Sequence, residues 1–158
     1  MNKIFTLIFS VLILFSCSKS SPAGFWNKFN SESIIEKSSD QGPYGGKRKI
    51  VWKNFNNKLL NQDFLKFANK NGWELIDSLE IRNNDFNSDK TTNLDKYSIE
   101  IIKNEIIPKI LNQNSKIFIF KTGWIRIKPG NEIETQQNGF LVFDSVNKTY
   151  NIFHNWGE

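Results

Sequence analysis

The sequence contains very little cysteine and histidine. Its 158 residues include one of each, Cys17 and His154. A single cysteine cannot form a disulfide within the chain, and one Cys with one His cannot supply the ligands of a Cys/His zinc site. We therefore expect no disulfide framework, no bound metal and no cofactor. The longest apolar run, residues 4–15, is also shorter than the ~20 residues of a membrane-spanning helix.

The amino terminus has the layout of a secretory signal. Lys3 provides a short positive start, and the apolar run of residues 4–15 follows it directly. The run ends in Leu14-Phe15-Ser16-Cys17. A short basic start, a short apolar stretch and a small residue at the cleavage point are typical of a segment that is removed on export.

These four residues resemble the lipobox of bacterial lipoproteins, which has Leu three positions before a Cys and a small residue just before it. The resemblance implies cleavage between Ser16 and Cys17, a diacylglyceryl group on the Cys17 thiol, and acyl chains such as palmitate as the membrane anchor. In that class Ser18, directly after the Cys, favours sorting to the outer membrane. The alternatives are an ordinary cleaved signal followed by a chance cysteine, or a transmembrane anchor.

Composition divides the remaining chain into a tether and a domain. Residues 18–46 are rich in Ser, Gly and Pro, which is typical of a flexible linker. We therefore predict a signal peptide at 1–16, a lipidated Cys with a tether at 17–46, and one domain at 47–158. The aromatic cluster Phe25-Trp26-Asn27-Lys28-Phe29 interrupts the tether. It could rest at the lipid interface or pack onto the domain, and packing is favoured.

Two stretches have the periodicity of amphipathic helices. In residues 57–71, Leu60, Phe64, Phe67 and Ala68 are spaced by three or four positions, and in residues 95–111 an inner stripe is formed by Ile99, Ile102, Ile106 and Ile110. Pro108 cannot donate a backbone hydrogen bond, so we expect the second helix to kink or break near Asn104.

The other periodic segments are predicted strands at residues 48–53, 73–81, 116–128, 139–144 and 148–156. Alternation places Trp73, Leu75, Leu79 and Ile81 on one strand face. The continuously apolar residues 117–120 and 140–143 indicate strands that are covered on both faces. The fold class expected is α+β, with an antiparallel sheet of about four to five strands and one or two helices on one face.

Three groups of polar residues are candidates for catalytic or metal sites. Residues 85–89 resemble the start of a calcium loop, but Lys90 and Lys96 stand where that loop needs Gly and Glu. Glu132 and Glu134 would share a face if their segment were extended, although neighbouring carboxylates do not normally form a glycosidase cleft. The sequence contains no nucleophile motif that would accompany a catalytic His154. A structural or edge-exposed position is therefore favoured for this residue. We predict no catalytic residue and no metal ligand.

Basic residues beside tryptophan suggest a binding face. The chain has 21 basic and 16 acidic residues, a net charge of +5. Lys47-Arg48-Lys49 lies near Trp52, and Trp124, Arg126 and Lys128 alternate, so these last three are the predicted binding face. Nucleic-acid binders show such mixtures, but an exported protein would meet anionic lipid, glycan or envelope protein instead. Tryptophans in a domain of this size also serve as core residues.

These observations predict a lipid-anchored protein of the bacterial cell envelope with a non-catalytic binding or accessory domain. Its expected partners are the membrane, through the lipid, and an envelope protein or glycan, with no nucleic acid. One alternative is an anchored immunity protein that neutralises a secreted toxin. The other is a glycan-active enzyme that depends on His154 or Glu132. The sequence does not determine the oligomeric state.

Overall fold

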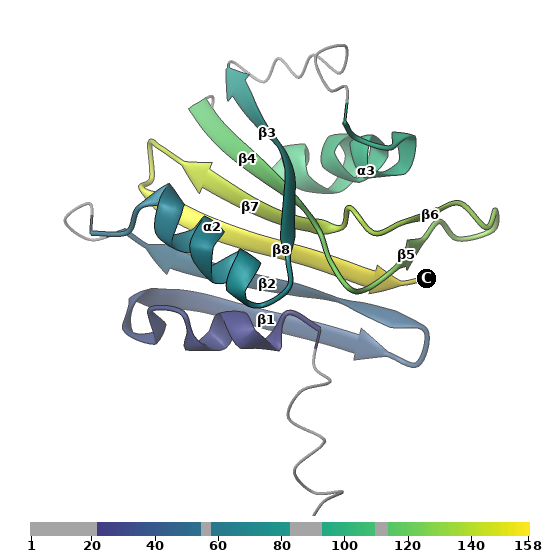
Figure 1. The fold of residues 1–158 in the computed structure, drawn as a ribbon, viewed down its shortest axis with the longest axis horizontal. Coiled ribbons are helices and arrows are strands. Elements are labelled where there is room, and N and C mark those ends of the chain that lie inside the picture. Colours follow the sequence, from purple (N-terminus) through teal and green to yellow (C-terminus); the bar gives the residue numbers. More distant parts are fainter. Residues whose placement is uncertain (1–21, 55–57, 83–92, 110–113) are drawn as a thin grey trace, which may run out of the picture.

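The fold is an antiparallel sheet with helices on both faces (Figure 1). A computed structural model describes residues 22–54, 58–82, 93–109 and 114–158. The sheet order is β1-β2-β8-β7-β4-β3, and each neighbouring pair is antiparallel. The six strands of this path are β1 Ile34–Gly42, β2 Gly45–Lys53, β3 Glu74–Arg82, β4 Asn114–Lys121, β7 Gly139–Asp144 and β8 Thr149–Gly157. Within the described segments, no helix is long and apolar enough to cross a membrane.

Two short strands extend the sheet beyond β8. β5 Arg126–Ile127 pairs with β6 Glu134–Thr135, and Arg126 also lies opposite Gly157 at the end of β8. The α+β class is thus confirmed, but the sheet has eight strands instead of the four to five predicted. The difference comes from β1, which lies in the predicted tether, and from β5 and β6. The strand predicted at 116–128 ends at Lys121, and β5 is a separate element.

The prediction of a flexible tether is wrong for residues 22–46. β1 pairs with β2 along its length, with Ser38 opposite Lys49, and a turn at residues 43–44 joins the two strands. Nearly every β1 side chain is exposed, so the strand has no apolar alternation that sequence analysis could detect. Backbone hydrogen bonds hold β1 at the sheet edge, where polar and charged side chains are common.

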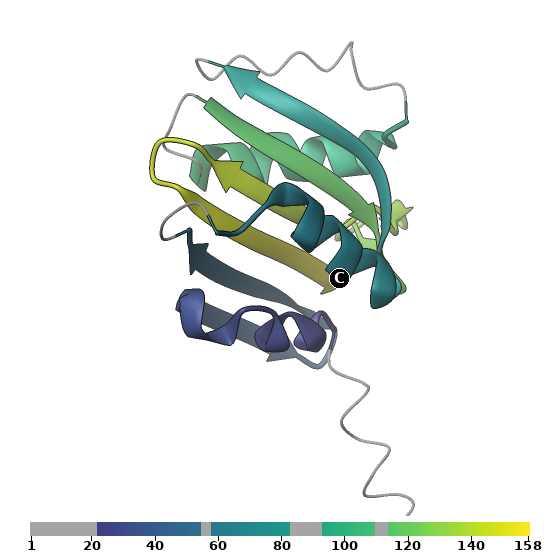
Figure 2. The ribbon, with the colours of Figure 1, turned by 60° about the vertical axis from the view of Figure 1, so that its left-hand side comes forward.

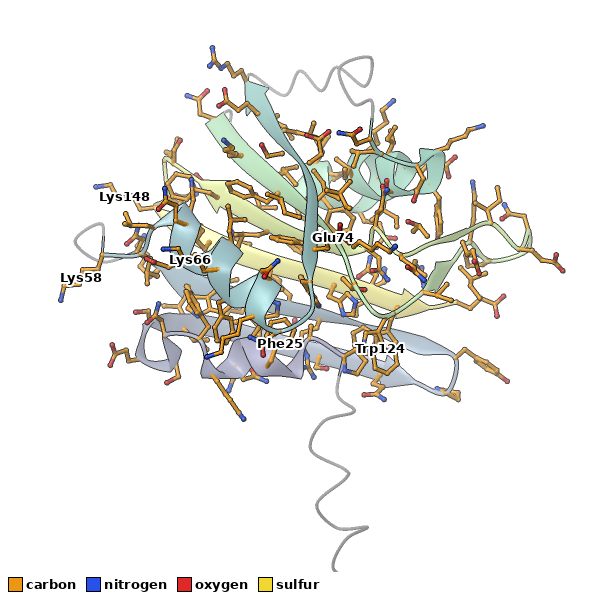
Figure 3. All side chains as sticks on the ribbon, viewed as in Figure 1. Phe25, Lys58, Lys66, Glu74, Trp124 and Lys148 are labelled. Atoms are coloured by element: carbon orange, nitrogen blue, oxygen red, sulfur yellow. The ribbon has the colours of Figure 1, made fainter. Side chains whose placement is uncertain are left out.

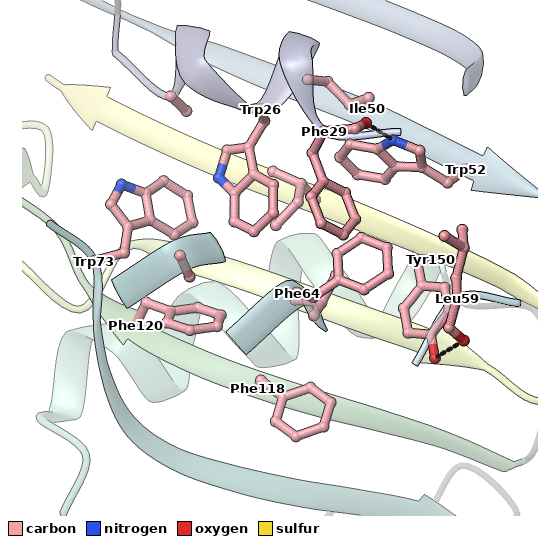
Figure 4. Close-up of a cluster of buried hydrophobic side chains, with 14 residues drawn as sticks. Trp26, Phe29, Ile50, Trp52, Leu59, Phe64, Trp73, Phe118, Phe120 and Tyr150 are labelled. Carbon is pink, nitrogen blue, oxygen red and sulfur yellow. Dashed lines mark hydrogen bonds between the residues drawn. The ribbon is translucent and has the colours of Figure 1, made fainter. Parts of the chain in front are cut away.

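The aromatic cluster before β1 packs onto the domain, which confirms the interpretation favoured from sequence. The 3-10 helix η2, Gly24–Lys28, and the short η3, Ser31–Ser33, precede β1. Trp26 is fully buried, and its ring meets Trp52 and Trp73 at centroid distances of 5.9 and 5.6 Å (Figure 4). The Trp52 indole Nε1–H donates to the Phe29 carbonyl at 2.8 Å.

The two helical segments cover opposite faces of the sheet, so the prediction of helices on one face is wrong (Figures 1 and 2). Helix α2, Asn61–Lys70, lies over one face. On the other lies α3, Lys96–Ile101, which continues as a π-helical turn, Ile102–Ile106, and a 3-10 turn, Ile107–Lys109. The helix predicted to kink or break near Asn104 instead stays helical, and it changes from α to π hydrogen bonding at Ile102.

Each face has its own hydrophobic core. Phe118 and Phe120 of β4 point into the α2-side core, whereas Ile117 and Ile119 point into the α3-side core. The prediction that 117–120 and 140–143 are covered on both faces is confirmed. The α2-side core comprises Ala23, Trp26, Phe29, Ile50, Trp52, Leu59, Phe64, Ala68, Trp73, Phe118, Phe120, Leu141, Tyr150 and Ile152. The α3-side core comprises Ile81, Tyr97, Ile101, Ile102, Ile106, Ile117, Ile119, Phe140, Val142 and Phe153.

A β-bulge divides β3 between the two cores. The register shifts between Leu75 and Asp77. One extra residue at a bulge breaks the alternation, so residues that would share a face lie on opposite faces before and after it. Trp73 therefore belongs to the α2-side core and Ile81 to the α3-side core, and Leu75 is 44% exposed. The single face predicted for Trp73, Leu75, Leu79 and Ile81 is wrong for this reason.

Candidate functional site

The predicted binding face of Trp124, Arg126 and Lys128 does not form a surface of free cations. Trp124 is 40% exposed in the connection between β4 and β5, but Arg126 is only 9% exposed. The Lys128 ammonium lies 2.6 Å from Oε2 of Glu100, which neutralises its charge. Of the three, Arg126 is the residue withdrawn from solvent, whereas the side chains of Trp124 and Lys128 are 40% and 35% exposed.

The other basic segment, Lys47-Arg48-Lys49, is split between the two faces of β2. Lys47 and Lys49 form salt bridges with Glu105 at 2.7 Å and with Glu36 at 2.8 Å. Trp52, which was considered as their aromatic neighbour, is fully buried. Consequently β2 does not present tryptophan beside exposed cations.

The acidic candidates do not converge on a site in the described residues. Glu132 has a left-handed backbone, with φ of 42°, and so its segment is not extended as the pairing with Glu134 required. Both side chains are exposed. Among the described residues, no group of three or more His, Cys, Asp or Glu side chains is placed to hold a metal ion. The calcium-like residues 85–89, and the predicted cleavage and lipidation residues Ser16 and Cys17, lie outside the described residues.

His154 is a core residue on the α2 side of the sheet. It is fully buried, stacked on Trp156 with centroids 5.2 Å apart, and 5.2 Å from the Trp73 ring. Burial, and secondarily the positive charge of Arg48, lowers the pKa of His154 to about 3. The imidazole is therefore neutral near pH 7 and enclosed by aromatic rings, in keeping with the structural position favoured from sequence.

A buried polar network beside His154 shapes the connection between β4 and β5. The Thr122 hydroxyl donates to Oδ1 of Asn138 at 2.6 Å and accepts from the Trp124 backbone N–H at 3.2 Å. The Asn138 amide donates to the carbonyls of Trp124 and Asn155 at 2.9 and 2.7 Å. Nε2 of His154 lies 3.4 Å from the Thr122 oxygen, and in the tautomer with the hydrogen on Nε2 the free lone pair of this oxygen accepts a hydrogen bond from the ring.

This network holds an irregular segment against the end of β8 because its buried backbone groups are satisfied from within the protein. The backbone N–H of Gly157 then donates to the Ile125 carbonyl at 2.7 Å. Trp124 and Ile125 are each 40% exposed. The network thus presents two large apolar side chains at a defined place on the surface.

Four of the eight large hydrophobic side chains that are exposed in the described residues gather at this end of the sheet. They form what we call the sheet-end surface: Tyr44, Trp124, Ile125 and Ile133. Tyr44, in the β1–β2 turn, is 78% exposed, and its carbonyl accepts from the Glu158 backbone N–H at 2.9 Å. Figure 3 shows Trp124 beside the connection between β4 and β5, inward of the β1–β2 turn.

A hollow of about 270 Å³ opens between the β1–β2 turn and β5. Its lining residues are Asp40, Gly42, Pro43, Tyr44, Gly45, Gly46, Lys47, Arg126 and Glu158. The turn can approach β8 closely because Gly157 has no side chain and a φ of 75°, and a Cβ there would collide with the Tyr44 carbonyl. The turn lies within the predicted tether, and no local sequence pattern indicates that it lies beside Arg126.

The described residues also form two other hollows. One of about 520 Å³ has Arg82 and Asn114 in its wall, next to residues 83–92 and 110–113, which lie outside the described residues. The other, of about 170 Å³, is lined on the α3 side by residues that include Lys49, Lys109 and Phe153. Neither of these hollows is bordered by the clustered apolar side chains of the sheet-end surface.

Comparison of the chain with protein-family models, with curated proteins and with solved structures gives no match.

Proposed function

We propose that this protein is a lipid-anchored protein of the bacterial cell envelope whose domain binds a partner through the sheet-end surface. The observation that carries the binding role is that four exposed large hydrophobic side chains belong to segments whose backbones are hydrogen-bonded at one end of the sheet. Contiguous exposed apolar side chains mark interaction sites on proteins, whereas scattered ones do not. The enclosure of His154 in a core supports a domain that does not catalyse a reaction.

The anchor is proposed from the resemblance of Leu14-Phe15-Ser16-Cys17 to a lipobox. The described residues begin at Pro22, and five residues separate it from Cys17, so this part of the chain can span at most about 18 Å. The lipid would therefore hold the domain close to the bilayer, with η2 and β1 on the side nearest the anchor. This is a much shorter connection than the tether that composition suggested.

The anchor is tested by changing its single sulfur. Cys17→Ala should abolish incorporation of labelled palmitate, because no other cysteine is present in the chain. Ser20→Ala should label normally and serves as the matched control. Normal labelling of Cys17→Ala would refute the assignment.

The binding role is tested by crosslinking the tagged, lipidated protein in cells and identifying the captured protein by mass spectrometry. The double variant Tyr44→Ser/Trp124→Ser should lose a stoichiometric partner. The control Ile35→Ser/Val146→Ser changes two side chains that are 57% and 62% exposed elsewhere and should retain it.

The identity of that partner separates the two forms of the proposal. An envelope protein would define an accessory role, and a secreted toxin would define an anchored immunity role. Capture of the same partner at full yield by the Tyr44/Trp124 variant would refute the sheet-end surface as the binding site, as would capture of nothing above background by the unchanged protein.

A further inference from the structure

Arg126 is a buried cation without a described counter-charge. Its side chain is 9% exposed, and its Nε lies in the interior without a hydrogen-bond partner among the described residues. The salt bridges of the described residues join other pairs. Arginine is almost never buried to this extent unless it is paired, because removing its charge from water is costly. An unpaired guanidinium in the wall of a hollow therefore points to an anionic ligand.

The hollow has the form of a site that is open to one side. Arg126 is held in place by β5, which pairs with β8 on one side and with β6 on the other. The facing wall is the β1–β2 turn, and Tyr44 at its tip is 78% exposed. The backbone of Arg126 is thus fixed in the wall of the hollow before any ligand arrives, which lowers the entropic cost of binding.

The charges around the hollow favour one class of anion. Asp40 and Glu158 also line it, and Lys47 on the same wall is already bonded to Glu105 at 2.7 Å. Two nearby carboxylates would repel a phosphate dianion strongly and a singly charged group less. A planar carboxylate also matches the two-pronged donor geometry of arginine.

We propose that Arg126 binds a carboxylate, supplied by an Asp or Glu side chain of the partner protein. Tyr44 lines the hollow, and Trp124 and Ile125 shortly precede Arg126 in the chain, so the acidic residue of the partner is flanked by apolar residues that cover Tyr44 and Trp124. This inference rests on the proposed function, since it names the ligand chemistry of that surface.

The first test uses the unchanged lipidated protein in detergent micelles and does not require a variant to fold. Acetate is titrated at constant ionic strength while the Nε–H resonance of Arg126 is followed by NMR. We expect a saturable shift with acetate and none with chloride. Absence of a saturable shift with acetate would overturn the proposal, and so would a shift that phosphate produces at lower concentration than acetate does.

The second test uses the crosslinking assay with Arg126→Gln, which removes the charge and retains a polar side chain. Capture of the partner should fall by about 30-fold or more, because a charge-assisted bond in a desolvated site is lost. Lys128→Gln is the matched control, since it removes a neighbouring cation that is already paired, and it should retain the partner.

The results separate this inference from the proposed function. In one case the Tyr44/Trp124 variant loses the partner, Arg126→Gln captures it fully, and acetate produces no shift. This result would overturn the carboxylate site but would leave the sheet-end surface as the binding site. Full capture by the Tyr44/Trp124 variant would instead refute the binding surface. If acetate still shifted the Arg126 resonance of the unchanged protein, the hollow would bind a free carboxylate ligand. That result would overturn the proposal that the carboxylate belongs to a partner protein.

Discussion

Mild acid should destabilise this protein through its single histidine. The pKa of His154 is about 3 in the folded protein, against an ordinary value of 6.5. Below pH 6.5 the unfolded chain therefore takes up a proton that the folded protein does not accept until about pH 3. The stability that comes from keeping His154 neutral is present above pH 6.5 and is lost progressively as the pH falls.

The magnitude follows from the two pKa values. Between pH 7 and pH 5, binding of this one proton by the unfolded chain lowers the free energy of unfolding by about 2 kcal/mol. Most carboxylates titrate below this window, and the chain contains no second histidine. The effect should therefore be attributable to one side chain.

The assay is urea unfolding, followed by tryptophan fluorescence, at several pH values from 7 to 5. His154→Gln is the comparison, because it cannot bind the proton. The free energy of unfolding of His154→Gln at pH 7 is expected to be lower than that of the unchanged protein. The readout is how this free energy changes with pH, and for His154→Gln it should change little between pH 7 and pH 5. If the unchanged protein and His154→Gln lose stability in parallel over this window, the argument is refuted. Ring resonances of His154 that titrate near pH 6.5 in the folded protein would refute it as well.

Three further changes test the core. Trp26→Ala should cost about 3–5 kcal/mol in urea unfolding because a fully buried ring is lost, and a cost below 1 kcal/mol would mean that residues 22–33 do not belong to the fold. Tyr150→Phe should remove the alkaline destabilisation that begins above pH 10, because burial and the charge of Asp63 raise the pKa of Tyr150 to about 12; an unchanged pH profile would contradict this. Gly139→Ala should lower the melting temperature by several degrees, since a Cβ would lie 2.6 Å from the Trp73 ring. Gly123→Ala, where a Cβ would meet nothing within 4 Å, is its control, and equal effects of the two would contradict the packing.

Elements whose own side chains are buried could be predicted from sequence. The strand predicted at 139–144 has these bounds in the structure, and the helix predicted at 57–71 is present as Asn61–Lys70. In both cases the apolar spacing is created by the core that the element covers. β1 lacked this signal because its side chains face solvent, and its position follows from pairing with β2, a partner that its own residues do not reveal.

The proposed binding surface shares one residue, Trp124, with the binding face predicted from sequence. That prediction placed Arg126 and Lys128 beside Trp124 as a positive surface. Arg126 is instead buried where β5 lies against the end of β8, and Lys128 is paired with Glu100. Alternation along a strand predicts which neighbouring residues share a face. In a strand of only two residues, Arg126–Ile127, the burial of each side chain depends on the elements that pack against it.

The sequence by itself determined the α+β class and the double coverage of residues 117–120 and 140–143, because these properties depend on side-chain spacing within one segment. The export and lipidation signal is likewise a local pattern, and it stands as a prediction. Only the tertiary structure decided which face each helix covers, that residues 22–46 are folded, and that Tyr44 lies beside Arg126. These features depend on contacts between segments far apart in the chain, where pairing and packing of the whole sheet outweigh local preference.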